Sequence, residues 1–450
     1  MGSSTPDTDS RLLNWFTQIK SHLRVPLYVN AYYLIANQAA NASIGVVYWI
    51  VAANFYPADV VGQNVAILSS IGLLGALAEL SLKAAVTRFV PRTGKHTRRF
   101  VLVVYGINLI AVLVVCALFY LAHRIAVHRQ LPLTGELLAA ASLGLGWLIL
   151  TTSCQLIFYI QDGVLVALRQ ARWVLIENSV FGVAKLALLI PALHISSRYG
   201  IVLSWYLPIP LLIIAANSLI FLKFIPNKDS WAEAPGPVPT VDEVVRTVGG
   251  DYLGTSIAEV GVRVLPLLVI AILGSKENAY FYQAWLISFT LTAVISGIMS
   301  SFTVEASVSP QRIPGLSRKI MRQTGLLVVP VAAFVWFAAD AILFFFGKDY
   351  TAAVPLLRWL AAAILPTIPN VWFLAYGRVT GRILPVIVSQ TIITAVALSS
   401  SYLLLPYFGI TAVGIAWFAA QLITAIYVAS RALPILLSSN DYAGTKDLTM

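Results

Sequence analysis

The sequence has too little charge for a soluble protein of its length. Only 11% of its 450 residues are Asp, Glu, Lys or Arg, whereas soluble globular proteins carry roughly 25%. Hydrophobic residues make up 59% of the chain, and the mean hydropathy is +0.83. Because so few charges cannot cover a water-facing surface, the composition predicts a protein whose outer surface lies in lipid.

Cysteine and histidine are also scarce, which excludes several kinds of site. Cys116 and Cys154 are the only cysteines and lie in apolar runs, so they form no disulfide framework. The 5 histidines are scattered and show no metal-ligand spacing. The chain also lacks a P-loop, and its one Asp-x-Asp motif, Asp7 to Asp9, lies in a polar terminal segment. We therefore expect no metal, no cofactor and no enzymatic activity.

The apolar residues fall into twelve runs, most of which reach the ~20 residues needed to cross a bilayer. Before them, residues 1–27 combine a polar tail with an amphipathic segment, which predicts a helix on the membrane surface. The predicted spans are 29–53, 61–86, 100–122, 136–160, 173–194, 200–224, 251–273, 279–302, 325–346, 355–376, 383–405 and 411–434.

One long polar segment divides the runs into two sets of six. It lies at 225–250 and is rich in proline and charge. The order of span, short outer turn, span and basic inner loop repeats in both sets, which predicts two related bundles around a central cavity. The predicted units are therefore a bundle at 28–224, a cytoplasmic linker at 225–250, a bundle at 251–434 and a tail at 435–450.

The net charge of +11 comes from basic residues in short segments between apolar runs, so it does not indicate a nucleic-acid partner. With the N-terminus inside, most lysines and arginines lie in cytoplasmic segments. The predicted outer segments hold only Arg124, Arg129, Arg198, Lys276 and Lys348. This bias predicts a multi-pass protein of the plasma (inner) membrane with both termini in the cytoplasm.

A few cations lie where the membrane should be, at Arg263, Lys185, Lys83 and Arg358. A charge at a helix centre costs ~2.5–3.5 kcal/mol on insertion scales, so such residues usually pair or face a cavity. Arg263 and Lys185 lie near the predicted midplane, one in each half, and Lys83 lies nearer the cytoplasm. We predict that these three bind an anionic headgroup, whereas Arg358 can reach the membrane interface.

Three carboxylates share this depth and form a second group of candidates. Glu259 precedes Arg263, and Glu79 precedes Lys83, by four residues, which places each pair on one helix face. Each pair can neutralise itself and join helices, or contribute to the cavity. Glu177 has no basic residue at this spacing, so it is the best candidate for a carboxylate that carries a proton or cation.

Amides form a polar stripe along the first predicted span. Asn37 and Asn41 follow helical spacing after Asn30. Interhelical hydrogen bonding is one interpretation, because amides often join helices in bilayers. The alternative is that they line a sugar-binding cavity.

Two stretches of the chain resemble polysaccharide flippases of the multidrug/oligosaccharidyl-lipid/polysaccharide exporter superfamily. The first extends from Asn30 to Arg92, and the second is FFFGKDYTAAVPLLRWLAAA at 344–363. The agreeing features are the Asn-aromatic start at 30–33, the aromatic-proline turn at 55–57, Val61-Gly62, Arg88, Pro91 and Arg92, and then Phe346-Gly347, Tyr350 and Leu357-Arg358.

The resemblance implies a flippase that moves a lipid-linked (polyprenyl-pyrophosphate) oligosaccharide across the membrane by alternating access. The partners would be this lipid-linked oligosaccharide, membrane lipids and the glycan assembly machinery, and cavity cations would meet the pyrophosphate. An alternative is a cation-coupled multidrug exporter of the same superfamily. A membrane-embedded glycan polymerase or ligase is the alternative from another class, which the short outer loops disfavour.

Overall fold

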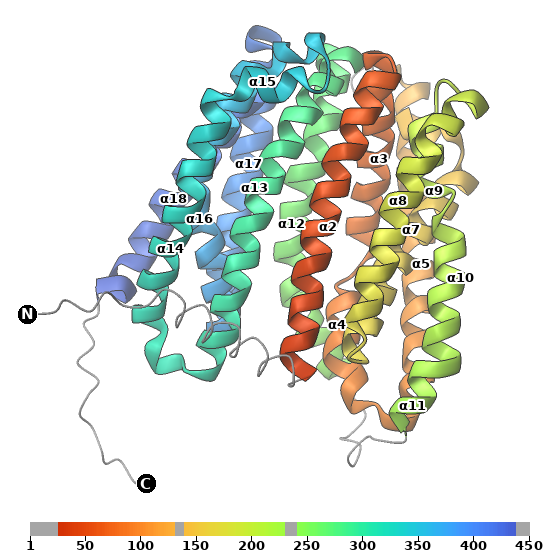
Figure 1. Cartoon of the computed structure of the whole chain (residues 1–450), viewed down its shortest axis with the longest axis vertical. Helices are drawn as coiled ribbons and strands as arrows, with labels where there is room; N and C mark the ends of the chain where they lie inside the picture. The colour runs from red at the N-terminus through yellow and green to blue at the C-terminus, as the bar shows by residue number, and fades with distance from the viewer. Residues whose placement is uncertain (1–25, 131–138, 230–240, 438–450) are drawn as a thin grey trace, which may run out of the picture.

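The structure, a computed structural model, describes residues 26–130, 139–229 and 241–437. All regular secondary structure within these ranges is helical, and 12 helices are long and apolar enough to cross a membrane. They lie side by side as one tall bundle (Figure 1). This confirms the predicted all-α membrane protein with about twelve spans. The predicted surface helix and C-terminal tail lie almost entirely outside the described residues.

The helices before residue 230 are called here the N-terminal half. Its first described helix starts at Pro26, the first residue that the structure describes. The half contains α2 (Pro26–Phe55), α3 (Ala58–Ala78), α4 (Leu82–Phe89), α5 (Thr97–His128), α7 (Leu145–Ala167), α8 (Ala171–Ile195), α9 (Gly200–Tyr206), α10 (Ile209–Leu219) and α11 (Ile225–Asp229), with short helical turns at η1 (Val90–Arg92), η2 (Gly94–His96), η3 (Ala139–Leu143) and η4 (Ile220–Phe224).

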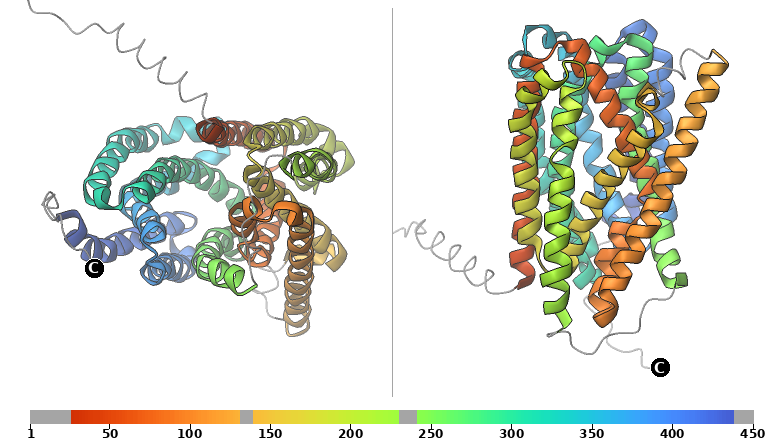
Figure 2. Two further views of the ribbon diagram at one scale, coloured as in Figure 1. Left: turned by 90° about the horizontal axis from the view of Figure 1, so that it is seen from below. Right: turned by 90° about the vertical axis from the view of Figure 1, so that its right-hand side faces the viewer.

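The helices after residue 240 are called the C-terminal half. Figure 2 shows most of its cyan, teal and blue helices on one side of the molecule, with the orange and yellow helices of the N-terminal half on the other. The half contains α12 (Val241–Leu273), α13 (Ser275–Val308), η5 (Pro310–Arg312), α14 (Ile313–Phe337), α15 (Ala339–Phe344), η6 (Lys348–Ala353), α16 (Val354–Thr380), α17 (Ile383–Phe408) and α18 (Thr411–Leu437).

The second span is broken, which the prediction of one helix at 61–86 missed. Helix α3 ends at Ala78 and α4 begins at Leu82. Between them, Leu80 and Ser81 have φ values of 48° and 51°, a left-handed conformation that is uncommon for residues other than glycine. The break turns α4 away from α3, and α4 packs on α7. An apolar run does not reveal such a break, because hydropathy is the same on either side of it.

Several predicted boundaries also move. The fourth span is at Leu145–Ala167 instead of 136–160, and the ninth is at Ile313–Phe337 instead of 325–346. The described residues of the predicted linker at 225–250 are helical, in α11 (Ile225–Asp229) and from Val241 onward in α12, and 230–240 lie outside the described residues. These residues are polar enough to be predicted as a loop, yet a helix can extend beyond the bilayer where water satisfies its side chains.

Contact between the halves is concentrated on α3, which packs on α12 and α13. At the start of α3, the Asn278 amide donates a hydrogen bond to the Gly62 carbonyl at 2.8 Å. The backbones approach so closely that a Cβ at Gly62 would lie 1.7 Å from the Ser275 carbonyl oxygen. Nearby, the Asn54 amide donates to the Phe345 carbonyl at 3.1 Å. The halves are therefore tightly closed at the end that charge bias predicts to be outside.

Candidate functional site

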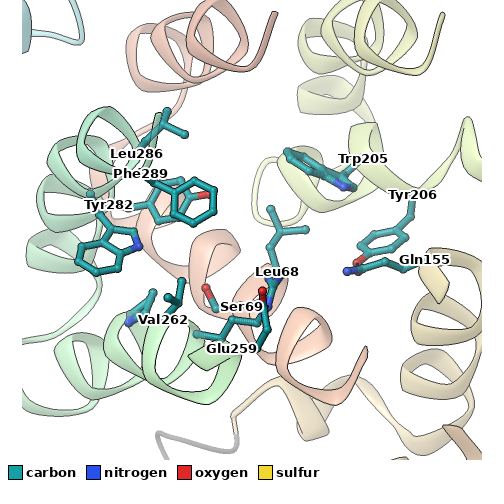
Figure 3. A pocket seen from close by; sticks show the side chains of 13 residues that line it. Leu68, Ser69, Gln155, Trp205, Tyr206, Glu259, Val262, Tyr282, Leu286 and Phe289 are labelled. Atoms are coloured by element: carbon teal, nitrogen blue, oxygen red, sulfur yellow. Dashed lines mark hydrogen bonds and ion pairs between the residues drawn. The ribbon is translucent and has the colours of Figure 1, made fainter. Parts of the chain in front are cut away.

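Two neighbouring pockets lie between the halves, with volumes of about 190 and 280 Å³. They share the lining residues Gln155, Trp205, Glu259 and Arg263, so we treat them as one chamber. Figure 3 shows side chains from both halves pointing toward this space, with Trp205 and Tyr206 facing Tyr282 and Phe289. A substrate in a space lined by both halves touches residues of each half. Its contacts would therefore change when one half moves against the other.

Aromatic rings make up much of the chamber wall. Tyr282 also contacts Trp49 at 4.7 Å between ring centroids, which links the wall across the two halves. Such rings provide flat apolar surface and an attractive face for cations. The aromatic lining residues are Phe158, Tyr159, Phe181, Trp205, Tyr206, Tyr252, Tyr282, Trp285 and Phe289.

The predicted pair Glu259–Arg263 forms and lies in the chamber wall. Arg263 Nε is 2.7 Å from Glu259 Oε2, and about a third of each side chain is exposed (35% and 38%). Helix α3 approaches the guanidinium at Gly72, where an added Cβ would lie 2.2 Å from Arg263 Nη1. This pair could be predicted from the sequence because an i, i+4 ion pair depends only on the spacing of its two residues along one helix, here α12.

Glu79 and Lys83 do not form the simple helical pair that their spacing predicts. The helix break intervenes, and Glu79 Oε1 accepts a hydrogen bond from the Lys83 backbone N–H at 2.8 Å, at the start of α4. The Lys83 ammonium lies 3.9 Å from Asp162 Oδ2 and 3.7 Å from the ring centroid of Tyr159. Lys83 therefore joins α4 to α7 and is not among the chamber-lining residues.

Asp162 is a chamber-lining carboxylate that the sequence analysis missed. The predicted fourth span ended at residue 160, which assigned Asp162 to a loop, whereas α7 continues to Ala167. The Asn178 amide donates to both carboxylate oxygens of Asp162, at 3.2 and 3.3 Å. A predicted span that started at Leu145, where α7 begins, would have included Asp162.

Glu177 belongs to a buried network behind the chamber wall. It accepts a hydrogen bond from the Gln161 amide, and the Asn217 amide donates to Gln161 Oε1 at 2.7 Å. Tyr105 donates to Asn217 Oδ1 at 2.9 Å. The second oxygen, Glu177 Oε2, is buried and has no hydrogen-bond partner among the described residues. The N-terminal half thus contains two neighbouring buried carboxylates, Asp162 and Glu177.

Lys185 is buried in an aromatic cage, with only 8% of its surface exposed. Its ammonium lies 3.7 Å from the ring centroid of Trp205, 5.0 Å from that of Phe181 and 5.1 Å from that of Tyr48. It is not among the chamber-lining residues, although Trp205 and Phe181 are. Among the ion pairs of the described residues, none involves Lys185.

The remaining sequence candidates lie away from the chamber. Asn41 donates to Asn37 at 3.3 Å within α2, and neither amide lines the chamber. Asn30 accepts a hydrogen bond from the Ala171 backbone N–H at 3.4 Å, a contact between helices. Arg358 pairs with Asp340 at 2.8 Å.

Among the described residues, the charged groups that line the chamber are three carboxylates, Glu79, Asp162 and Glu259, and one cation, Arg263. Of the three predicted cavity cations, only Arg263 is among the residues that line the chamber. The sequence could not show that Lys83 contacts Asp162 and Tyr159, or that Lys185 is enclosed by aromatic rings. It also left Asp162 outside the predicted spans.

Comparison with solved structures identifies the architecture. The chain is similar to a structure described as the inward-facing conformation of a multidrug resistance MATE family transporter of the MOP superfamily, with a TM-score of 0.64 and 14% identity over 93% of this chain and 99% of that one. The chain has the MATE transporter fold. No protein-family model matches the sequence, and no curated protein matches it.

Two further structures share the MATE fold. One is the outward-facing conformation of a multidrug resistance MATE family transporter, with a TM-score of 0.57, 13% identity and coverage of 90% of this chain and 96% of that one. The other is a MOP superfamily transporter from Pyrococcus furiosus, described as having a binding pocket of reversed polarity, with a TM-score of 0.61, 12% identity and coverage of 91% and 96%. At 12–14% identity, these similarities show a shared fold.

Proposed function

We propose that this protein exports organic cations with apolar rings across the membrane by alternating access of the chamber to its two sides. The observation that carries the proposal is the chamber wall, where aromatic rings surround three carboxylates and one guanidinium. Aromatic faces attract cations, most strongly where water is excluded. A net acidic wall adds attraction for positive charge and repels anions.

The same wall argues against the lipid-linked oligosaccharide that the sequence resemblance implies. A pyrophosphate needs cations that are free to meet its oxygens. Arg263, the one chamber-lining cation in the described part of the chain, is already paired with Glu259 at 2.7 Å. A pyrophosphate would also face Glu79 and the Asp162–Lys83 pair across the chamber, where no cation without a carboxylate beside it lines the wall among the described residues. The similarity in fold to multidrug transporters points in the same direction.

Energy coupling would use the buried acids of the N-terminal half. Asp162 faces the chamber, and Glu177 lies behind it with one oxygen unpartnered among the described residues. A carboxylate at membrane depth is suited to hold a proton or a small cation. Loading of this site from outside and release inside would exchange one positive charge for the exported cation. Because the Lys83 ammonium lies beside Asp162, it repels further cations and opposes binding of more than one cation at the site.

A transport assay in proteoliposomes tests the proposal. Vesicles that contain the purified full chain and trapped DNA are given an outward proton or sodium gradient and external ethidium. We expect ethidium fluorescence to rise faster than in protein-free vesicles and to collapse when the gradient is dissipated. The double variant Asp162→Asn, Glu177→Gln should still bind ethidium, more weakly because the chamber wall loses one carboxylate, and should lose the gradient dependence. Absence of ethidium transport, together with translocation of a polyprenyl-pyrophosphate lipid in the same vesicles, would overturn the proposal.

A further inference from the structure

A buried lysine without an acidic partner is an unusual feature of the described chain. Burial of an ammonium at membrane depth is costly unless an anion or water compensates it. For Lys185 the compensation comes from rings, with Trp205 at 3.7 Å and Phe181 and Tyr48 near 5 Å. The other deep cations differ, because Lys83 and Arg263 each lie beside a carboxylate.

The cage shares its central ring with the chamber. Trp205 lines both pockets, and Phe181 lines one of them. A further ring, Trp49, lies 6.3 Å from Trp205 and 4.7 Å from Tyr282, which connects the cage to the C-terminal wall. A cation that enters the chamber therefore meets an indole that already interacts with the Lys185 ammonium.

We propose that Lys185 is a tethered cation that competes with the transported organic cation for the aromatic wall at Trp205 and so limits the affinity of the chamber. This inference rests on the proposed function, and it assigns to the site a class of ligand, an ammonium beside an aromatic group. Aromatic cages are well suited to bind quaternary ammonium groups. In this chain, the cage is occupied by a side chain of the protein itself.

Two physical effects make Lys185 a competitor. Its positive charge has no anion beside it among the described residues, so it repels any cation in the nearby chamber through protein of low dielectric. It also occupies one face of Trp205, the indole that lines the chamber. A transporter gains from such a limit, because a ligand that binds too tightly is released slowly.

Binding measurements on the full-length protein in nanodiscs test this role. The probes are benzyltrimethylammonium and benzylsulfonate, which share a ring but carry opposite charges. We expect Lys185→Met to bind benzyltrimethylammonium about tenfold more tightly than the wild type and to bind benzylsulfonate more weakly. Lys185→Arg, which keeps the charge, and Lys348→Met, which removes an exposed lysine outside the chamber, should stay within about twofold of the wild type.

The outcomes separate this inference from the proposed function. If the wild type binds benzyltrimethylammonium and Lys185→Met binds it equally or less tightly, the competitor role is wrong and the proposed function stands. If the wild type and Lys185→Met both fail to bind it, the proposed function and the inference fall together. Lys185→Gln replaces Lys185→Met if the latter does not fold, as judged by thermal unfolding and size-exclusion chromatography.

Discussion

Single charges at membrane depth behave differently in this protein according to what lies beside them. Arg263 is neutralised by Glu259 on its own helix, and Lys83 lies beside Asp162 on another. Lys185 has aromatic rings around it instead. The residue type alone therefore does not decide whether a cation is available to a substrate; its nearest neighbours do.

The Glu259–Arg263 pair allows a test of the chamber's charge by two opposite substitutions. Glu259→Gln leaves Arg263 as an uncompensated cation, so we expect benzyltrimethylammonium to bind about tenfold more weakly. Arg263→Gln leaves Glu259 as an uncompensated anion, so binding should tighten. Calorimetric titration measures both constants.

Glu305→Gln is the matched control for this pair, because Glu305 is an exposed residue of α13 away from the chamber. It should not change the dissociation constant. Equal constants for Glu259→Gln and Arg263→Gln would contradict an electrostatic contribution of the pair to cation binding.

At the scale of helices, the contact of α3 with α13 depends on a glycine. A methyl group at Gly62 would collide with the backbone of Ser275, and the collision cannot be relieved by a side-chain rotation. We expect Gly62→Ala to separate the two helices at this end and to lose the Asn278–Gly62 hydrogen bond. The closed arrangement should therefore become less populated.

Cross-linking measures this closure. Cysteines at Asn54 and Phe345, whose contact joins the halves at the same end, should cross-link readily through a short bismaleimide when Cys116 and Cys154 are replaced by serine. Gly62→Ala should reduce the yield at least severalfold. Gly45→Ala and Gly297→Ala, where an added Cβ has nothing within 4 Å, should leave it unchanged. An undiminished yield in Gly62→Ala would show that the close approach does not hold the halves together.

For the whole molecule, the basic inner segments predict that both chain ends face the cytoplasm. Fusions after Leu437 test one of these ends. Green fluorescent protein should fluoresce there, because it folds in the cytoplasm, and alkaline phosphatase should be inactive, because its disulfides do not form there. A phosphatase fusion after Arg129, in a predicted outer segment, should be active. The reverse pattern would invert the orientation of both halves and of the proposed transport.

Features that depend on composition and on neighbours along one helix can be predicted from the sequence of this protein. The twelve apolar runs predicted the twelve spans, because a helix must be long and apolar to cross the hydrocarbon of a bilayer. The spacing of Glu259 and Arg263 produced their ion pair. The predicted span at 200–224 is interrupted between α9 and α10, next to Pro208, because proline cannot donate the backbone hydrogen bond of a continuous helix.

Which charges meet in the chamber depends on how helices far apart in the chain pack together. Asp162 faces it because α4, α7 and α8 pack together, and Lys185 turns into a cage made by residues up to 157 positions apart, such as Tyr48 and Trp205. These contacts join segments far apart in the chain, and helical periodicity carries no information about which faces will meet. The sign of the chamber's charge, and with it the proposed substrate, therefore follows from packing.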